Sequence, residues 1–380
     1  MSDAVEAFSL AVPESQIEDL RGRLARTRWP EREPVGDESQ GVSLDRMRSL
    51  CDYWRTRYDW RRCEARLNAL GQYRAEIDGL GLHFLHIRSP APRALPLIMT
   101  HGWPGSVIEF LKVVGPLTDP TAYGGDPGDA FDLVLPTLPG FGFSGKPATT
   151  GWGVERIADA WITLMRRLGY GRYVAQGGDW GAAVTHALAL RNPPECVAAH
   201  LTVARVRPTD EQRCAQTPAE AAALSDHARF MAEGTGYSLI QSTRPQTIGY
   251  GLTDSPAAQA AWIYDKYDAW TDHKSGPEEV LGIDEMLDNI MMYWLPSAAA
   301  SSARLYRESA PAVYSRAPVT MPVGFSIFPK EIWRASRRWA EPVYTNIIHW
   351  NEPVRGGHFA AFEQPGLFVD ELRACFRTVR

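Results

Sequence analysis

The sequence has few cysteines and no long apolar run, and both absences exclude classes of protein. Its five cysteines are odd in number and scattered along the chain, so we expect reduced thiols rather than a disulfide framework. No apolar run approaches the roughly 18 residues that span a bilayer, and the polar start of the chain is unlike a secretory signal. We therefore expect a soluble, cytoplasmic protein with no membrane anchor.

Basic clusters and metal-ligand spacings are also missing. The formal net charge is −5 and no basic block stands out, which argues against a nucleic-acid partner. His83 and His86 have an H-x-x-H spacing, but they lie in a run typical of a strand, where residues three apart point to opposite faces. We therefore expect no metal site.

What is present indicates a globular α/β protein with an inserted helical region. Residues 1–81 show amphipathic helical periodicity, interrupted by an extended strap at 29–34. Over 82–204 short strands alternate with helices, which predicts a mostly parallel sheet covered on both faces. Residues 205–316 are mainly helical and rich in aromatics, and strand signals return over 317–380. We predict a two-part core with a helical lid between core strands and an N-terminal helical wrapping segment.

The pentapeptide Gly177-Gly178-Asp179-Trp180-Gly181 is the strongest local motif. It follows a short β-branched and aromatic run and precedes an apolar stretch compatible with a helix. Gly-x-nucleophile-x-Gly in this context is typical of the nucleophile elbow of α/β-hydrolases, a strained turn that exposes its central side chain. By itself the pattern is more often an ordinary turn, so the catalytic interpretation depends on finding a suitable acid, base and oxyanion donors elsewhere in the chain. Here the central residue is a carboxylate, which the N-terminus of the helix would keep ionised.

Candidate partners follow in the order nucleophile, acid, histidine that this fold uses. Glu331 comes after one predicted strand and His358 after the next. A solvated glutamate and a packed histidine are the ordinary interpretations, but the order Asp179, Glu331, His358 favours a catalytic set. The backbone N–H groups of Trp103 and Trp180 are the expected oxyanion donors.

A carboxylate nucleophile restricts the reaction to alkyl electrophiles. Its attack on an sp³ carbon leaves an ester that a histidine-activated water can hydrolyse, whereas a serine would leave an ether. Epoxides and haloalkanes both qualify. An epoxide departs as an alkoxide and needs an acid, for which the lid tyrosines are suited, whereas a halide needs only N–H donors such as Trp180. Epoxide hydrolysis is favoured, a haloalkane dehalogenase remains the alternative, and a non-catalytic ligand-binding protein of this fold is a third.

The chain resembles the microsomal-type epoxide hydrolases, which include the juvenile hormone epoxide hydrolases. The match extends over nearly the whole chain, including the Trp29-Pro30 strap, and its motifs are specific in combination. The segments that carry it are His101 to Ser106, Gly177 to Gly181, Gly236 to Pro245, Leu252 to Pro256, Phe325 to Glu331 and Arg355 to Glu363.

This resemblance implies Asp179 as nucleophile, His358 as base and Glu331 as its orienting acid. It implies that Tyr237 and Tyr306 bind and protonate the epoxide oxygen, whereas His101 supports the oxyanion loop without transferring a proton. It also implies a hydrolase without a cofactor, acting with water on small apolar epoxides, in detoxification or aromatic hydrocarbon catabolism. The polar start of the chain indicates the soluble branch of the family, and a homodimer is left open.

Overall fold

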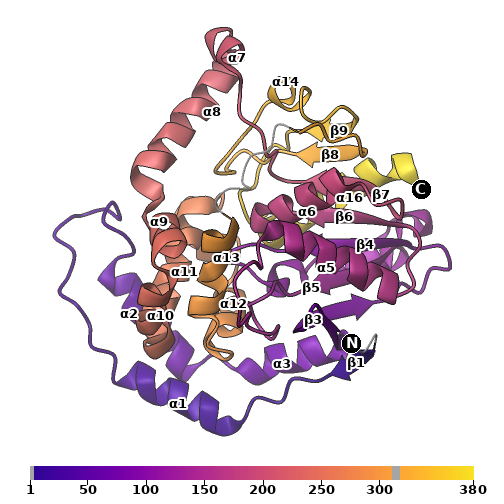
Figure 1. Cartoon of the computed structure of the whole chain (residues 1–380). Helices are drawn as coiled ribbons and strands as arrows, with labels where there is room; N and C mark the ends of the chain where they lie inside the picture. The colour runs from indigo at the N-terminus through magenta and orange to yellow at the C-terminus, as the bar shows by residue number, and fades with distance from the viewer. Residues whose placement is uncertain (1–3, 310–316) are drawn as a thin grey trace.

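A computed structural model describes residues 4–309 and 317–380 (Figure 1). The first three residues and the predicted end of the lid at 310–316 lie outside the described residues. No helix in the described part of the chain is both long and apolar enough to cross a membrane.

The described residues form one nine-stranded sheet with the order β1-β2-β3-β5-β4-β6-β7-β8-β9. The pairs from β5 through β9 are parallel, and those among β1, β2, β3 and β5 are antiparallel. Carboxyl ends of parallel strands meet at one edge of a sheet, which is where α/β folds place their sites. The strands are β1 (Val5–Phe8), β2 (Gln72–Ile77), β3 (Leu80–Ile87), β4 (Leu95–Thr100), β5 (Phe131–Pro136), β6 (Tyr173–Gly177), β7 (Cys196–Leu201), β8 (Val323–Ser326) and β9 (Ile347–Asn351).

The expectation that residues 1–81 are helical with an extended strap was wrong in one respect. β1 and β2 belong to the sheet, and β3 begins at Leu80 rather than Leu82. Asp78 and Gly79 connect β2 to β3 with φ angles of 56° and 77°, the left-handed pair of a two-residue hairpin turn. An Asp-Gly turn signal was therefore present in the sequence. β1 pairs with β2, which lies more than sixty residues later in the chain, and no turn signal next to β1 indicates this pairing.

Helices α5 (Val154–Arg167) and α6 (Asp179–Arg191) pack against each other and lie in front of the strands in Figure 1. The apolar residues of α5 form a buried stripe, with Ile157, Trp161 and Leu164 among its members. α6 contacts β4, β6 and β7, and α16 (Pro365–Phe376) contacts β7 and β9. The contacts of α6 with α5 and with these three strands hold α6, and with it Asp179, at the end of the central strand β6.

Helices of the lid occupy the chain between β7 and β8, as the sequence predicts for an insertion. Prolines at the first turn begin three of them, because proline fits the helix start where no N–H bond is lost. The lid elements are α7 (Asp210–Cys214), α8 (Pro218–Arg229), a π-helical turn at Phe230–Gly234, α9 (Gly236–Thr243), α10 (Pro245–Asp254), α11 (Pro256–Trp270), α12 (Ile283–Trp294) and α13 (Ala299–Ser309).

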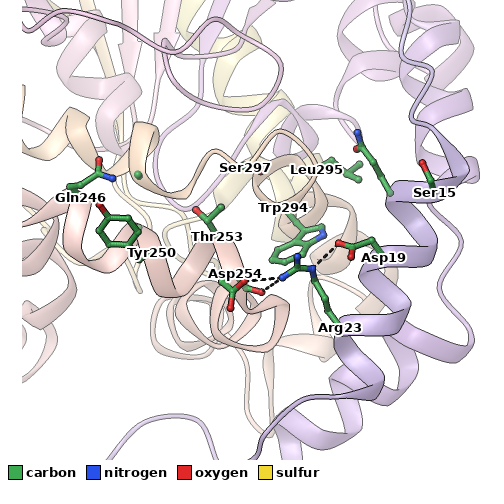
Figure 2. Close-up of a pocket in the computed structure, with 13 residues that line it drawn as sticks. Ser15, Asp19, Arg23, Gln246, Tyr250, Thr253, Asp254, Trp294, Leu295 and Ser297 are labelled. Atoms are coloured by element: carbon green, nitrogen blue, oxygen red, sulfur yellow. Dashed lines mark hydrogen bonds and ion pairs between the residues drawn. The ribbon is translucent and has the colours of Figure 1, made fainter.

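The N-terminal segment packs against the lid through α1 (Glu14–Ala25), α2 (Leu44–Thr56) and α3 (Trp60–Ala69). α1 and α2 contact α11, and α3 contacts α12. Arg23 reaches across from α1 to donate to Asp254 of α10, beside an open surface pocket of about 680 Å³ (Figure 2). Deeper in, Tyr58 and Arg62 donate to Asp288 of α12. The segment therefore holds the lid at an exposed and at a buried contact.

Candidate active site

Asp179 lies on the sharp turn between β6 and α6 and has a positive φ of 48°. Left-handed backbone is strained for a residue with a side chain, and such strain recurs at functional sites. Two glycines allow the turn: a Cβ at Gly177 would lie 2.1 Å from the Gly181 carbonyl oxygen, and one at Gly181 would lie 1.8 Å from that of Thr100. The predicted strand, turn and helix around Asp179 are confirmed.

The Asp179 carboxylate is held from two sides. Its Oδ1 accepts the Trp103 backbone N–H at 2.8 Å, and the Trp180 N–H also donates to the carboxylate. Its Oδ2 lies 3.4 Å from His358 Nε2. Only 18% of the side chain is exposed, so the expectation of an exposed carboxylate was wrong, because the lid covers the elbow. Burial by itself would raise the pKa of Asp179, but His358 and the backbone donors outweigh it and lower that pKa below its ordinary value.

His358 and Glu331 form a buried pair behind Asp179. His358 Nδ1 lies 2.8 Å from Glu331 Oε1, which also accepts the Ile332 N–H at 2.8 Å. The backbone N–H of His358 donates to the backbone carbonyl of Trp270 in the lid at 2.9 Å, which fixes the loop that carries the histidine. Burial by itself would lower the pKa of His358, but the charge of Glu331 and hydrogen bonds to Asp179 and Glu331 raise it well above its ordinary value. The structure thus brings the predicted acid, base and nucleophile together.

Tyr237 of α9 and Tyr306 of α13 meet above the elbow. The Tyr237 ring stacks on Trp103 with centroids 4.9 Å apart, and the Tyr306 ring contacts Trp180 edge-on at 4.8 Å. The two tyrosine rings are 5.8 Å apart, and their hydroxyls are hydrogen-bonded. Burial raises the pKa of Tyr306 most, and the charges of Tyr237 and Asp179 raise it further. Burial and, after it, the charge of Asp179 also raise the pKa of Tyr237. Both therefore keep their protons at neutral pH and can donate them.

A cavity of about 330 Å³ opens beside these groups. Asp179, His358 and both tyrosines border it, so the candidate nucleophile, base and proton donors line one space. Its remaining wall is largely apolar and includes Phe230, Met231, Leu239, Ile332 and Trp333. A small, mainly apolar ligand with one polar atom fits such a site.

The oxyanion loop, His101 to Ser106, is held by groups on both sides. His101 Nε2 accepts the Leu138 N–H at 3.2 Å, so its Nδ1 carries the proton and donates to the Gly102 carbonyl at 2.9 Å. Burial lowers the pKa of His101 to about 4, which keeps the ring neutral. This arrangement fits the supporting role expected for His101.

Sequence reasoning missed Asn289 of α12, which holds the same loop from the lid side. Its Oδ1 accepts the Ser106 hydroxyl at 2.7 Å, and its Nδ2 donates to the Pro104 carbonyl at 2.8 Å. Tyr293, one turn later, donates to the Gly105 carbonyl at 2.7 Å. No sequence signal distinguished Asn289 from any polar residue in an amphipathic helix, because its partners in the oxyanion loop lie more than 180 residues away.

No group of His, Cys, Asp and Glu in the described ranges could hold a metal ion. The five cysteines are free thiols, four of them buried.

Comparisons with known proteins agree with this geometry. A family model described as Epoxide hydrolase N terminus matches residues 5–110, and one described as alpha/beta hydrolase fold matches residues 96–234. A putative epoxide hydrolase of Stigmatella aurantiaca is 57% identical over 99% of this chain and 86% of its own length.

Two solved structures are similar along nearly their whole length. The epoxide hydrolase of Aspergillus niger has 31% identity and a TM-score of 0.88, with 99% of this chain and 97% of that chain covered. The juvenile hormone epoxide hydrolase of the silkworm Bombyx mori has 29% identity and a TM-score of 0.91, with 99% and 95% covered. The chain therefore belongs to the epoxide hydrolase family and has the α/β-hydrolase fold.

Proposed function

We propose that this epoxide hydrolase converts epoxides to vicinal diols through an ester on Asp179. The observation that carries the proposal is the convergence of a carboxylate, a histidine–glutamate pair and two tyrosine hydroxyls on one apolar cavity. Binding alone requires none of these groups together, so the arrangement argues against a non-catalytic role.

Ring opening is the first step. Asp179 Oδ1 accepts the Trp103 N–H, which leaves Oδ2, directed at His358, as the oxygen that attacks an epoxide carbon. The carbon–oxygen bond of the ring breaks, and the departing alkoxide takes a proton from Tyr237 or Tyr306. Such an alkoxide is too basic to leave unassisted, and a positioned acid contributes roughly 10²–10⁴-fold to the rate.

Ester hydrolysis is the second step. Ester formation removes the negative charge of Asp179, one of the groups that raise the pKa of His358, so the imidazole loses its proton more readily and its neutral form can accept a proton from water. The hydroxide adds to Cγ of Asp179, and the N–H groups of Trp103 and Trp180 stabilise the oxyanion. Removing one such donor typically costs roughly 10²–10³-fold in rate. Collapse of this intermediate expels the diol oxygen, which takes the proton from His358. The proton left on the Asp179 acid then returns through His358 to the tyrosinate, which restores both the carboxylate and the tyrosine. Glu331 holds the charged imidazole in place throughout.

The tyrosine pair favours epoxides over haloalkanes as substrates. A halide leaves as a stable anion and needs no proton, so two buried O–H donors bordering the cavity would serve no purpose in a dehalogenase. The volume and largely apolar wall of the cavity favour small apolar epoxides.

We further propose that the enzyme acts in the cytoplasm, in detoxification or in the catabolism of aromatic hydrocarbons. Its free cysteines fit a reducing compartment.

Mass spectrometry of a trapped intermediate tests the mechanism. His358→Gln should allow ring opening but block hydrolysis, so mixing it with styrene oxide should add the full mass of the epoxide, mapped to Asp179. The same variant with Asp179→Asn added is the matched control and should gain no mass. A butyl adduct from 1-bromobutane with none from styrene oxide would move the assignment to dehalogenase. No adduct from either compound would contradict the proposed nucleophile.

A further inference from the structure

A second, much smaller cavity borders the same catalytic pair. It leaves about 20 Å³ for the centres of water molecules, enough for one or two waters. Asp179 and His358 line both cavities, but Tyr237 and Tyr306 line only the larger one. Asp179 and His358 therefore border a second space, which the tyrosines expected to hold the epoxide do not line.

Buried polar groups of the core line this small cavity. Gln176, two residues before the elbow glycine Gly178, is almost fully buried, and its Oε1 has no hydrogen-bond partner within the described part of the chain. Thr202, which follows β7, and Glu109, on the 3₁₀ turn Val107–Phe110, also line it. An unpartnered buried amide oxygen costs free energy, so a water that donates to it is the expected occupant.

Glu109 is held in place by the oxyanion loop. A Cβ at Gly105 would lie 1.1 Å from Glu109 Oε1, so the carboxyl occupies the space that any side chain at 105 would take. The Ser106 backbone N–H also donates to this carboxyl. Burial is the largest effect on Glu109 and raises its pKa to about 8 despite the opposing charge of His358. At neutral pH it is mainly a neutral acid, able to donate and accept hydrogen bonds.

We propose that Glu109 and Gln176 form a water-binding site that supplies and orients the water that hydrolyses the Asp179 ester. The water gives one proton to His358 Nε2 while its oxygen bonds to Asp179 Cγ, and its other proton is held by Gln176 Oε1. Glu109 completes the site by hydrogen bonding and neither gains nor loses a proton. Both are positioning residues for the second half-reaction, and the inference rests on the ester mechanism proposed above.

The two half-reactions separate this role from a structural one. Glu109→Leu and Gln176→Met remove the hydrogen bonds and retain bulk, so each should slow ester hydrolysis about tenfold or more, the effect of one lost hydrogen bond to a buried group. Alkylation does not use this water. Therefore kcat and KM should fall together, kcat/KM with styrene oxide should stay within about twofold, and the ester should accumulate in single-turnover mass spectra. Glu109→Gln, which preserves a neutral hydrogen-bonding group, should retain most of the hydrolysis rate.

The outcomes distinguish this inference from the proposed mechanism. An ester in His358→Gln but no accumulation in Glu109→Leu or Gln176→Met would overturn the water site alone. Loss of kcat/KM and of the alkylation rate in both variants would show that these residues shape the loop rather than position water, and would also overturn it. If thermal melting shows that one variant does not fold, the result with the other variant decides the test. Absence of an ester in His358→Gln would instead contradict the mechanism itself.

Discussion

Ser106 of the oxyanion loop donates a hydrogen bond to Asn289 of the lid, with Oγ and Oδ1 2.7 Å apart. The same amide donates to the Pro104 carbonyl and to the Tyr267 hydroxyl of α11. Through this one side chain, two lid helices fix the loop that presents the Trp103 N–H to Asp179. The position of the lid and the geometry of the oxyanion site are therefore coupled.

Replacing Asn289 with leucine should lower kcat without removing any reacting group. We expect a loss of about tenfold, less than the roughly 10²–10³-fold cost of removing an oxyanion donor itself. Steady-state kinetics with styrene oxide measure it. Ser106→Ala tests the same contact from the other side. Because the two residues share one hydrogen bond, the double variant should cost less than the two single losses combined, and additive losses would argue against this coupling.

The tyrosine pair should affect ring opening and not hydrolysis. Tyr237→Phe and Tyr306→Phe should each slow alkylation of Asp179 by roughly ten- to a hundredfold, and the double variant should be nearly inactive, within the range of a lost general acid. Stopped-flow tryptophan fluorescence or quenched single turnovers would follow the step. Tyr250→Phe, whose side chain is 70% exposed on α10, is the control and should have no effect. A double variant with near-wild-type alkylation would refute the assignment.

Asp288 should make the stability of the protein depend on pH. Burial raises its pKa to about 6, although Tyr58 and Arg62 hydrogen-bond to it. Its folded pKa lies above the unfolded value near 3.9, so the folded state binds the proton more tightly and stability falls as pH rises from about 4 through 6. The contribution is on the order of 2–3 kcal/mol. Urea unfolding of wild type and Asp288→Asn across this range should show a clearly smaller decline in the variant.

Two arginines that join the N-terminal segment to the lid should differ sharply in importance. Arg62→Ala leaves Asp288, 2% exposed, without its cation, and should reduce the free energy of unfolding by roughly 3 kcal/mol at pH 7. Arg23→Ala breaks a contact to Asp254, 84% exposed, and should cost less than about 1 kcal/mol. Urea titrations monitored by circular dichroism measure both. Equal losses would show that burial does not govern these contacts.

Sequence reasoning could pick out the candidate nucleophile, acid and base, which the structure brings together, because they follow strands that end at one edge of the sheet. Asp179 follows β6, Glu331 follows β8 and His358 follows β9, so a strand pattern and a spacing motif sufficed. The alternation of short strands and helices over 82–204 likewise predicted the parallel part of the sheet. These features depend on residues that are close together in the sequence, so local periodicity predicts them.

What sequence reasoning missed depends on contacts between distant residues. β1 is four residues long, and only its pairing with β2 makes it a strand. β2 carries the charged Arg74 and Glu76, which weakened its strand pattern despite the Asp-Gly turn that follows. Asn289 and Glu109 acquire their roles from the docking of the lid and the loop, which no local pattern encodes. Such residues are found only once the fold places them.

The two cavities that border Asp179 and His358 draw part of their lining from different parts of the chain. Phe230, Met231 and Leu239, which line the larger one, belong to the inserted helices, whereas Glu109 and Gln176, which line the smaller one, belong to the core. Mutation can therefore reshape the range of epoxides admitted while the deacylation machinery stays intact. Substrate choice and turnover are separable traits in this enzyme, open to independent variation by evolution or by design.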